Sequence, residues 1–371
     1  MKNARLWQAL TLFATTAAVT MGIALAVSWS YARKLEESVN QPFIVRERVE
    51  TNALPVSPLL MHYALELPGR GEIFPALTIG APAEYWPVAI LTLTNDSEHP
   101  ALQTISTEVP NWSQRQEQTL ILGAHESRQM RLSPQLLPAA YQNQEIQRAP
   151  LSVRVSDERG DVLYAQTRPV LIHSSNDIYW GQRFSNAQFV ARWVTPHDPS
   201  VLNVVSEARA FAPRGRLAGY LNPPKTPNGL DAQVRMQADA VFRALSRSGL
   251  SYVSSIFTFG EHVGEAQRIR LPRETLQLKN ANCMDVSAVF ASAMENLGMK
   301  PVIVIIPGHA FAGVKLGEQS QQILYLDLTV LPRGTFDQAI ARAQGWLKKT
   351  PPEQVLTVDI ASARAMGIYP M

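Results

Sequence analysis

One stretch of the chain holds the residue types that a cysteine nucleophile needs. Cys283 is the only cysteine in the 371-residue sequence, and His309 and Asp327 follow it in that order. A thiolate can attack a carbonyl carbon, an imidazole can take and return the proton, and a carboxylate can hold the imidazole in one tautomer. The three positions therefore predict a Cys-His-Asp triad that acts through an acyl-thioester.

A helix that begins at Cys283 would present the thiol. The apolar positions after it recur at three- and four-residue steps, which predicts one buried helical stripe that ends before Gly298. These positions are Val286, Val289, Phe290, Ala293, Met294 and Leu297. Free N–H groups and the dipole in the first turn favour a thiolate and lower its pKa. Asn280 and Asn282 are suitable capping residues, whereas the charge of Asp285 would oppose a thiolate.

The histidine and the aspartate fall on two predicted strands of one sheet. The pattern predicts strands at 301–306, 309–316 and 322–329, with a turn at 317–321. With the second hairpin centred on Gln319, His309 faces Thr329, and Asp327 is its diagonal neighbour on the same face. A shift of two residues would make them direct opposites. The opposite, core-facing side takes Leu324, Leu326 and Leu328.

Each of these residues also has an ordinary structural explanation. A lone cysteine is usually a small buried apolar residue, and a lone histidine on a strand is usually structural. The combination of a helix-start cysteine with a face-matched histidine and aspartate favours catalysis instead. The Cys283 N–H is a natural oxyanion donor, and Gln277 is a candidate for the second donor. The arginines and lysine at 268, 270, 273 and 279 could attract acidic substrates, but a solvated basic face is the favoured interpretation.

The β-rich part of the chain precedes this stretch. Short runs of alternating hydrophobicity between turn residues predict an antiparallel, immunoglobulin-like β-sandwich over residues 59–176. The runs are 61–67, 88–95, 119–123, 150–156 and 162–167. The histidines at 62, 99, 125 and 173 lack metal-ligand spacing, so we expect isolated surface or partly packed side chains. We expect a second domain, α+β in class, over residues 177–371.

Within this second domain, the periodicity predicts a helix over 230–250. The loop at 215–229 could border a substrate cleft, although a simple connection is the favoured interpretation.

The first residues predict a membrane anchor. Residues 6–29 carry no charge and are long enough to cross a bilayer, which needs roughly 20 residues. We therefore expect a transmembrane signal-anchor over 1–33 and a linker over 34–58. A cleaved signal peptide is the alternative, since residues 24–26 fit an A-x-A cleavage site. A single anchor of this kind predicts an inner-membrane, single-pass protein with its body in the periplasm; a cytoplasmic body is the alternative.

Composition excludes other classes. The net charge of +3 is too small to argue for a nucleic-acid partner. A single cysteine excludes an internal disulfide framework. Nothing in the pattern implies a metal or an organic cofactor. A protein or peptide substrate, for example one in the cell envelope, is the partner that the predicted triad implies.

The triad region resembles bacterial members of the transglutaminase-like superfamily, which are papain-like cysteine enzymes. The similarity rests on the segment NANCMDVSAVFASAMENLGMKPVIVIIPGHAFAGV, with its C-x-D helix and P-G-H-A-F strand, and on flanks at 267–276 and 358–370. It extends from about Asn186 to Met371. The resemblance implies a papain-like fold, with Cys283 as nucleophile, His309 as base and Asp327 as the residue that orients the base.

Three functions remain open at this point. The first is a cysteine hydrolase, a peptidase or amidase, that acts on peptide or isopeptide amides. The second is a protein-glutamine amine transferase, which would give the same acyl group to an amine. The third is a non-catalytic envelope scaffold that keeps the fold and binds a partner.

Overall fold

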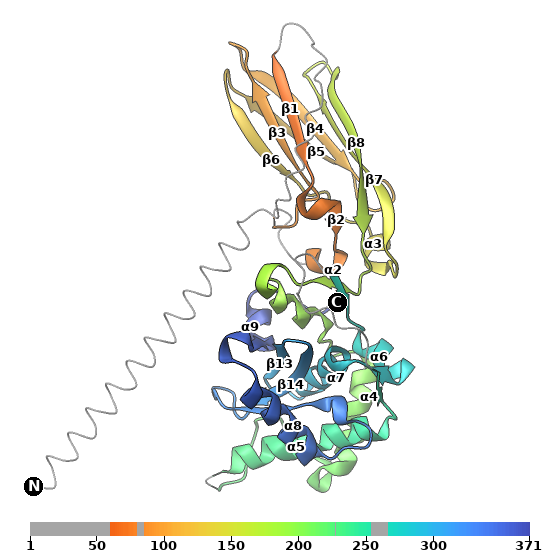
Figure 1. The fold of residues 1–371 in the computed structure, drawn as a ribbon, viewed down its shortest axis with the longest axis vertical. Helices are drawn as coiled ribbons and strands as arrows, with labels where there is room; N and C mark the ends of the chain where they lie inside the picture. Colours follow the sequence, from red (N-terminus) through yellow and green to blue (C-terminus); the bar gives the residue numbers. More distant parts are fainter. Residues whose placement is uncertain (1–59, 80–84, 227, 254–265) are drawn as a thin grey trace, which may run out of the picture. The chain divides into compact units, whose positions relative to one another are not determined.

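The computed structural model describes residues 60–79, 85–226, 228–253 and 266–371. The expected membrane anchor at 1–33 and the linker at 34–58 lie outside these residues. Within the described part, no helix is long and apolar enough to cross a membrane. The chain has a mixed α+β fold, as the sequence predicts (Figure 1).

The first described part contains two β-sheets. One has the strand order β1-β3-β6 and is antiparallel. Its strands are β1 (Met61–Glu66), β3 (Ala89–Asn95) and β6 (Ser127–Leu132). The other has the order β2-β8-β7-β4-β5, in which β2 runs parallel to β8 and the remaining pairs are antiparallel. Its strands are β2 (Glu72–Ile73), β4 (Ala101–Glu108), β5 (Gln116–Leu122), β7 (Gln147–Ser156) and β8 (Val162–Ile172).

The two sheets enclose one hydrophobic core. Strand β7 shows why, since Leu151, Val153 and Val155 are fully buried while the residues between them reach solvent in part. This period of two places one face of a strand in the core. Residues from both sheets meet in the same cluster, among them Leu91 of β3 and Leu122 of β5. The predicted strands of this part are confirmed, and the immunoglobulin-like topology stays a prediction.

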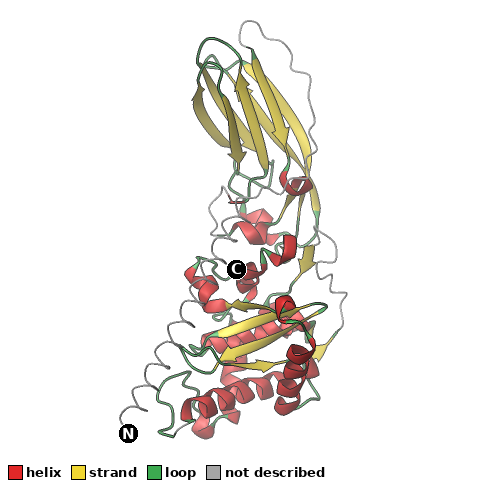
Figure 2. Cartoon of the chain, turned by 60° about the vertical axis from the view of Figure 1, so that its left-hand side comes forward, coloured by secondary structure: helices red, strands yellow, loops and turns green. Residues whose placement is uncertain are grey.

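The second described part is built around a four-stranded antiparallel sheet with the order β15-β14-β13-β16 (Figure 2). Its strands are β13 (Pro301–Ile306), β14 (His309–Lys315), β15 (Ile323–Leu326) and β16 (Leu356–Asp359). Its helices are α4 (Pro199–Ala208), α5 (Gly229–Arg247), α6 (Pro272–Leu278), α7 (Cys283–Asn296), α8 (Phe336–Lys349) and α9 (Ile360–Ala365).

Short elements complete both parts. Strand β9 (Asp177–Tyr179) pairs with β11 (Ala266–Arg268), and β10 (Ser251–Tyr252) pairs with β12 (Asn280–Ala281). Two short helices, α2 (Pro75–Thr78) and α3 (Pro138–Gln142), belong to the β-rich part. The 3-10 turns are η1 (Pro68–Gly71), η3 (Gln182–Phe184), η4 (Ala187–Trp193), η5 (Arg209–Phe211), η6 (Pro213–Gly215), η7 (Leu328–Val330) and η8 (Pro352–Gln354).

Helix α7 packs on one face of the second sheet. Its predicted stripe is buried from Val286 to Met294, with Leu297 partly buried just after the helix, and it shares a core with Ala312, Val314 and Leu326. The helix ends where predicted, because Gly298 follows with φ +72°, a conformation that glycine adopts without strain. The other face packs against the second half of α8, through Ala343, Trp346 and Leu347.

The loop at 215–229 has a structural role at the far end of α7. The Tyr220 hydroxyl donates to the Lys315 carbonyl at 2.8 Å and accepts from the Lys300 N–H at 3.1 Å. A Cβ atom at Gly219 would lie 2.2 Å from the carbonyl oxygen of Leu297, which caps the end of α7. Because Cys283 begins the same helix, this loop connects and packs, and does not border the thiol.

Candidate active site

A capping box fixes the first turn of α7, with Cys283 as its first residue. The Asn282 side chain accepts hydrogen bonds from the N–H groups of Met284 and Asp285, at 2.9 and 2.8 Å. The Asp285 carboxylate in turn accepts the Asn282 N–H at 3.2 Å. Both partners satisfy donors that a helix start leaves free. The predicted place of Cys283 in the first helical turn is therefore confirmed.

Asp285 also ties the helix start to the segment before α6. Its Oδ1 accepts the Arg270 backbone N–H at 2.9 Å, and its Oδ2 lies 3.7 Å from the Arg270 guanidinium. Burial raises the pKa of Asp285, and the N–H donors and Arg270 offset only part of this effect. The carboxylate is 1% exposed. The Asp285 carboxylate therefore serves a structural role, because its hydrogen bonds fix the backbone around Cys283.

The Cys283 thiol is sealed in the resting structure. The residue is 2% exposed. Burial raises the pKa of the thiol to about 12, although the backbone N–H groups of Ala310 and Met284 donate toward the sulfur, and the charge of Asp327 raises it further. The expectation of a lowered pKa is therefore wrong for this state. Desolvation of the charged form outweighs the helix end when the sulfur has so little contact with water.

His309 and Asp327 meet in the predicted register. Strand β14 pairs with β15 so that Ala312 faces Leu326 and Gly313 faces Tyr325, which is the pairing centred on Gln319. His309 Nε2 lies 2.9 Å from Asp327 Oδ2. No shift of register is needed, because β15 ends at Leu326 and Asp327 caps the following turn η7. The chain leaves the strand there and brings the carboxylate diagonally onto the imidazole.

The Asp327 carboxylate has a full set of partners. Oδ2 accepts from Trp346 Nε1 at 3.0 Å in addition to His309, and Oδ1 accepts from the Thr329 N–H at 3.1 Å and the Thr329 hydroxyl at 2.7 Å. The Arg342 Nε atom lies 3.1 Å from Oδ2. Burial alone would raise the pKa of Asp327, but the hydrogen bonds from His309 and Thr329 and the charge of His309 outweigh it and lower the pKa. The carboxylate therefore stays ionised.

The backbone joins the sulfur to this pair. The N–H that donates toward Cys283 belongs to Ala310, the residue directly after His309 on β14. His309 is 7% exposed and Asp327 is fully buried. The structure thus brings the start of α7 and the start of β14 together, with the imidazole held from β15 and α8. Because Nε2 faces Asp327, Nδ1 is the ring nitrogen that can exchange a proton with a thiol.

Sequence reasoning missed several residues of this site. Thr329, Arg342 and Trp346 all contact Asp327, and Ala310 contacts the sulfur. The four-residue spacing of Arg342 and Trp346 places them on one side of a helix. That spacing carries no information about which carboxylate they meet. Gln277 lies exposed on α6, whereas Cys283 is buried, so the structure gives it no support as an oxyanion donor.

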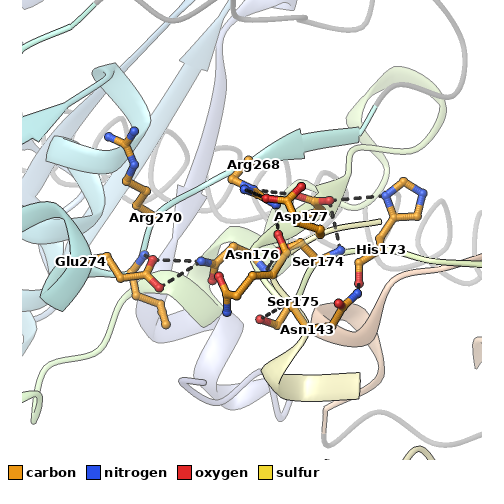
Figure 3. Close-up of polar contacts among 12 residues, drawn as sticks. Asn143, His173, Ser174, Ser175, Asn176, Asp177, Arg268, Arg270 and Glu274 are labelled. Carbon is orange, nitrogen blue, oxygen red and sulfur yellow. Dashed lines mark hydrogen bonds and ion pairs between the residues drawn. The ribbon is translucent and has the colours of Figure 1, made fainter. Parts of the chain in front are cut away.

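A polar junction supports the segment that leads to α7 (Figure 3). The Asn176 side chain donates to both oxygens of Glu274 on α6, at 2.9 and 3.2 Å. Arg268 Nε lies 3.4 Å from Asp177 Oδ1, and the two residues face each other on the paired strands β11 and β9. Figure 3 shows Asp177 of β9 pointing toward Arg268 of β11, and Asn176, just before β9, pointing toward Glu274 of α6.

The basic residues before the cysteine are largely solvated, and their arginines also lie near acidic groups. Arg268, Arg270 and Arg273 each have an acidic partner within 4.0 Å, and these partners are Asp177 and Glu145, Asp285, and Asp198. Lys279 is exposed at the C-terminal cap of α6, in a left-handed conformation. The arginine side chains are 44%, 37% and 53% exposed, so solvent screens these ion pairs around α6.

No metal site is apparent, since no group of three or more His, Cys, Asp or Glu side chains in the described ranges could hold an ion. A cavity of about 610 Å³ lies elsewhere, lined by residues of α5, η5 and the start of α8. None of the three triad residues lines it.

Comparison with known proteins does not identify the chain. No family model matches it, and no curated protein sequence matches it. Among solved structures it is similar to an exo-chitosanase of Amycolatopsis orientalis in complex with PNP-β-D-glucosamine, at 12% identity and a TM-score of 0.21. A crystal structure of the same exo-chitosanase gives 13% identity and a TM-score of 0.19. In both cases the match covers 56% of this chain and 28% of the chitosanase.

Proposed function

We propose that the protein is a cysteine hydrolase, a peptidase or amidase, that cleaves peptide or isopeptide amides through an acyl-thioester. The observation that carries the proposal is the 2.9 Å contact between His309 Nε2 and Asp327 Oδ2, made from strand β14, which shares a hydrophobic core with the helix that Cys283 begins. A buried, fully hydrogen-bonded carboxylate behind an imidazole is the arrangement that prepares a base for a nucleophile.

The proposed reaction has two halves. His309 takes the thiol proton through Nδ1 while the Cys283 sulfur bonds to the amide carbonyl carbon. The backbone N–H of Cys283 donates to the oxyanion. Collapse of the tetrahedral intermediate breaks the C–N bond, and the imidazolium gives its proton to the departing amine. Water then attacks the thioester with His309 as base, which releases the carboxylic acid and restores the thiol.

The raised pKa of Cys283 determines how the first half must proceed. With a pKa of about 12, the resting sulfur is a neutral thiol at physiological pH. Proton transfer to His309 therefore accompanies attack, as for a serine nucleophile, and does not precede it as a stable ion pair. Since Cys283 is 2% exposed, substrate reaches the sulfur only after neighbouring side chains move.

The wider proposal follows the sequence resemblance. We propose that residues 177–371 form a transglutaminase-like domain and that residues 59–176 form an immunoglobulin-like spacer or recognition domain. An anchor at 1–33 would hold both at the periplasmic face of the inner membrane. The described core of α7 packed on an antiparallel sheet supports the first of these statements.

Two alternatives use the same residues. Transfer of the acyl group to an amine in place of water would make the protein an amine transferase, because the thioester is common to both reactions. A non-catalytic scaffold is favoured by one observation, the sealed thiol with its raised pKa.

Labelling with an electrophilic amide mimic separates the enzyme from the scaffold. We expect wild type to form a covalent adduct at Cys283, and we expect Cys283→Ser to form none. His309→Asn should lower the labelling rate by about 10²–10⁴-fold, the loss typical of a missing catalytic base. Envelope peptides from cells that carry wild type or Cys283→Ser then test turnover. The hydrolase proposal fails if wild type and His309→Asn label at the same rate and if cells with wild type and cells with Cys283→Ser give the same envelope-peptide profile.

An added amine distinguishes the two reactions. If a fluorescent primary amine is incorporated into protein by wild type but not by Cys283→Ser, the transferase replaces the hydrolase. If free acid is the product at all amine concentrations, hydrolysis is the reaction.

A further inference from the structure

The Asp327 carboxylate already accepts a full set of hydrogen bonds without Arg342. An ionised carboxylate offers about four lone-pair sites. Four hydrogen bonds fill them, from Trp346, His309 and the two donors of Thr329. The Arg342 Nε atom is a fifth neighbour, 3.1 Å from the same Oδ2 that binds His309. Arg342 therefore adds a positive charge to a carboxylate whose hydrogen bonding is already complete.

The positive charge of Arg342 works against the usual role of the aspartate in a His-Asp pair. A carboxylate helps an imidazole because its negative charge stabilises the imidazolium. A guanidinium on the same oxygen offsets part of that charge. The Arg342 side chain is 50% exposed, so solvent screens the effect.

We infer that Arg342 is a positioning residue that limits how strongly the Asp327 charge holds a proton on His309. This inference rests on the proposed function, because it concerns the same His309 base. Arg342 Nε lies 3.1 Å from the Asp327 Oδ2 atom that binds His309 Nε2, so its positive charge offsets part of the negative charge behind the imidazole. It acts through Asp327 and touches no substrate.

The charged groups around His309 can be named from each packed element that the structure describes. Asp327, at the end of β15, binds Nε2, and Arg342 of α8 lies on the same carboxylate oxygen. Cys283 of α7 contacts the backbone next to His309. Trp346 of α8 is uncharged and places its ring 5.0 Å from the imidazole. The pH dependence of this site is therefore set by three titratable or charged neighbours.

Alkylation of Cys283 by iodoacetamide tests the inference without a substrate. Cys283 is the sequence's one cysteine, so adduct mass reports this thiol. The pH–rate curve has an acid limb, where His309 loses its proton, and a plateau set by the share of thiolate–imidazolium pair. In Arg342→Met the acid limb should move up by about half a pH unit and the plateau should rise about threefold, a small shift because the guanidinium is half-exposed.

Two further variants separate charge from packing. Arg342→Lys keeps the positive charge and should reproduce the wild-type curve. Lys349→Met removes one charge from the exposed last turn of the same helix, has no contact with Asp327, and should also match wild type. NMR titration of the His309 ring in the same proteins measures the acid limb directly, even where alkylation of the sealed thiol is slow.

Three results would overturn the inference. The first is an Arg342→Met curve equal to that of Lys349→Met. The second is an Arg342→Lys curve equal to that of Arg342→Met, since the charge would then be irrelevant. The third is a lower plateau with an unmoved acid limb, which a purely structural contact would give. A shifted limb in a protein that cleaves no amide would leave the inference standing while the proposed function fails.

Discussion

In the described part of the chain, two buried histidines lie beside aspartates, and they differ in how they contact them. His309 Nε2 lies 2.9 Å from Asp327 Oδ2 within hydrogen-bonding geometry. The His173 ring lies 3.4 Å from Asp177 and 3.9 Å from Glu72, and neither ring nitrogen has a hydrogen-bond partner. His173 is 5% exposed, so our expectation of a surface or partly packed side chain is wrong for it.

The surrounding elements explain the difference. The ring of His173 stacks on Phe74 at 3.9 Å between ring centres, which fixes its plane by packing. Asp177 is directed elsewhere, because its carboxylate accepts the Ser174 N–H at 3.2 Å and lies 3.4 Å from Arg268 (Figure 3). His309 is held by a hairpin register whose next residues turn the carboxylate toward it. An aspartate close to a histidine therefore forms a hydrogen bond with the imidazole only where the backbone orients its carboxylate toward the ring.

The largest expected effect comes from removing each aspartate in turn. Asp327→Ala leaves the His309, Trp346 and Thr329 donors without their acceptor in a fully buried place. Loss of one member of a buried, hydrogen-bonded pair costs about 3–5 kcal/mol. Asp177→Ala should cost about 1–2 kcal/mol, because it loses one backbone donor and a partly exposed arginine.

Thermal unfolding and labelling of Cys283 measure this contrast. Asp327→Ala should also lose most of its labelling rate, while Asp177→Ala should label like wild type. Equal losses of stability from the two substitutions would show that the orientation of the carboxylate toward the imidazole does not contribute to stability. A slower labelling rate in Asp177→Ala would show that the polar junction of Figure 3 also contributes to the candidate site.

Alkaline pH gives a smaller effect through the Cys283 thiol, which belongs to the His309 site. The pKa of Cys283 rises from an ordinary 9.0 to about 12 in the folded chain. Between these values the unfolded chain has lost the thiol proton and the folded chain has kept it. Stability from this group is therefore complete below pH 9 and is lost as pH rises toward 12, by roughly 1–4 kcal/mol in total.

Cys283→Ser isolates this contribution from the tyrosines, whose raised pKa values act in the same direction. Urea unfolding at pH 7 and pH 10 should show a smaller alkaline loss in Cys283→Ser than in wild type. The same alkaline loss in both proteins would mean that the thiol is not sealed, and would restore the lowered pKa that a helix start favours.

Local patterns were enough to predict the parts of the site that neighbouring residues determine. The stripe from Val286 to Leu297 identifies α7, and the turn centred on Gln319 identifies the register of β14 and β15. The leucine parity identifies which face holds Asp327. Each of these follows from residues close together in the sequence.

Other features depend on residues far apart in the sequence and could not be predicted. The raised pKa of Cys283 results from burial by the whole domain. Trp346 meets Asp327 only because α8 packs back over the sheet. His173 is buried because Phe74, about a hundred positions earlier, covers it. Periodicity identifies such elements and does not say what they pack against.

The smallest expected effect is the most direct test of the comparison between the two histidines. His173→Leu removes an imidazole that makes no hydrogen bond through either nitrogen and replaces it with an apolar group of similar size, so we expect a change within about 1 kcal/mol. His309→Leu removes a bonded imidazole and should cost about 1–3 kcal/mol and abolish labelling. Thermal unfolding at pH 7 measures both. A loss in His173→Leu as large as that in His309→Leu would mean that the 3.4 Å approach to Asp177 is a genuine ion pair, and hydrogen-bond geometry would then fail to distinguish the two sites.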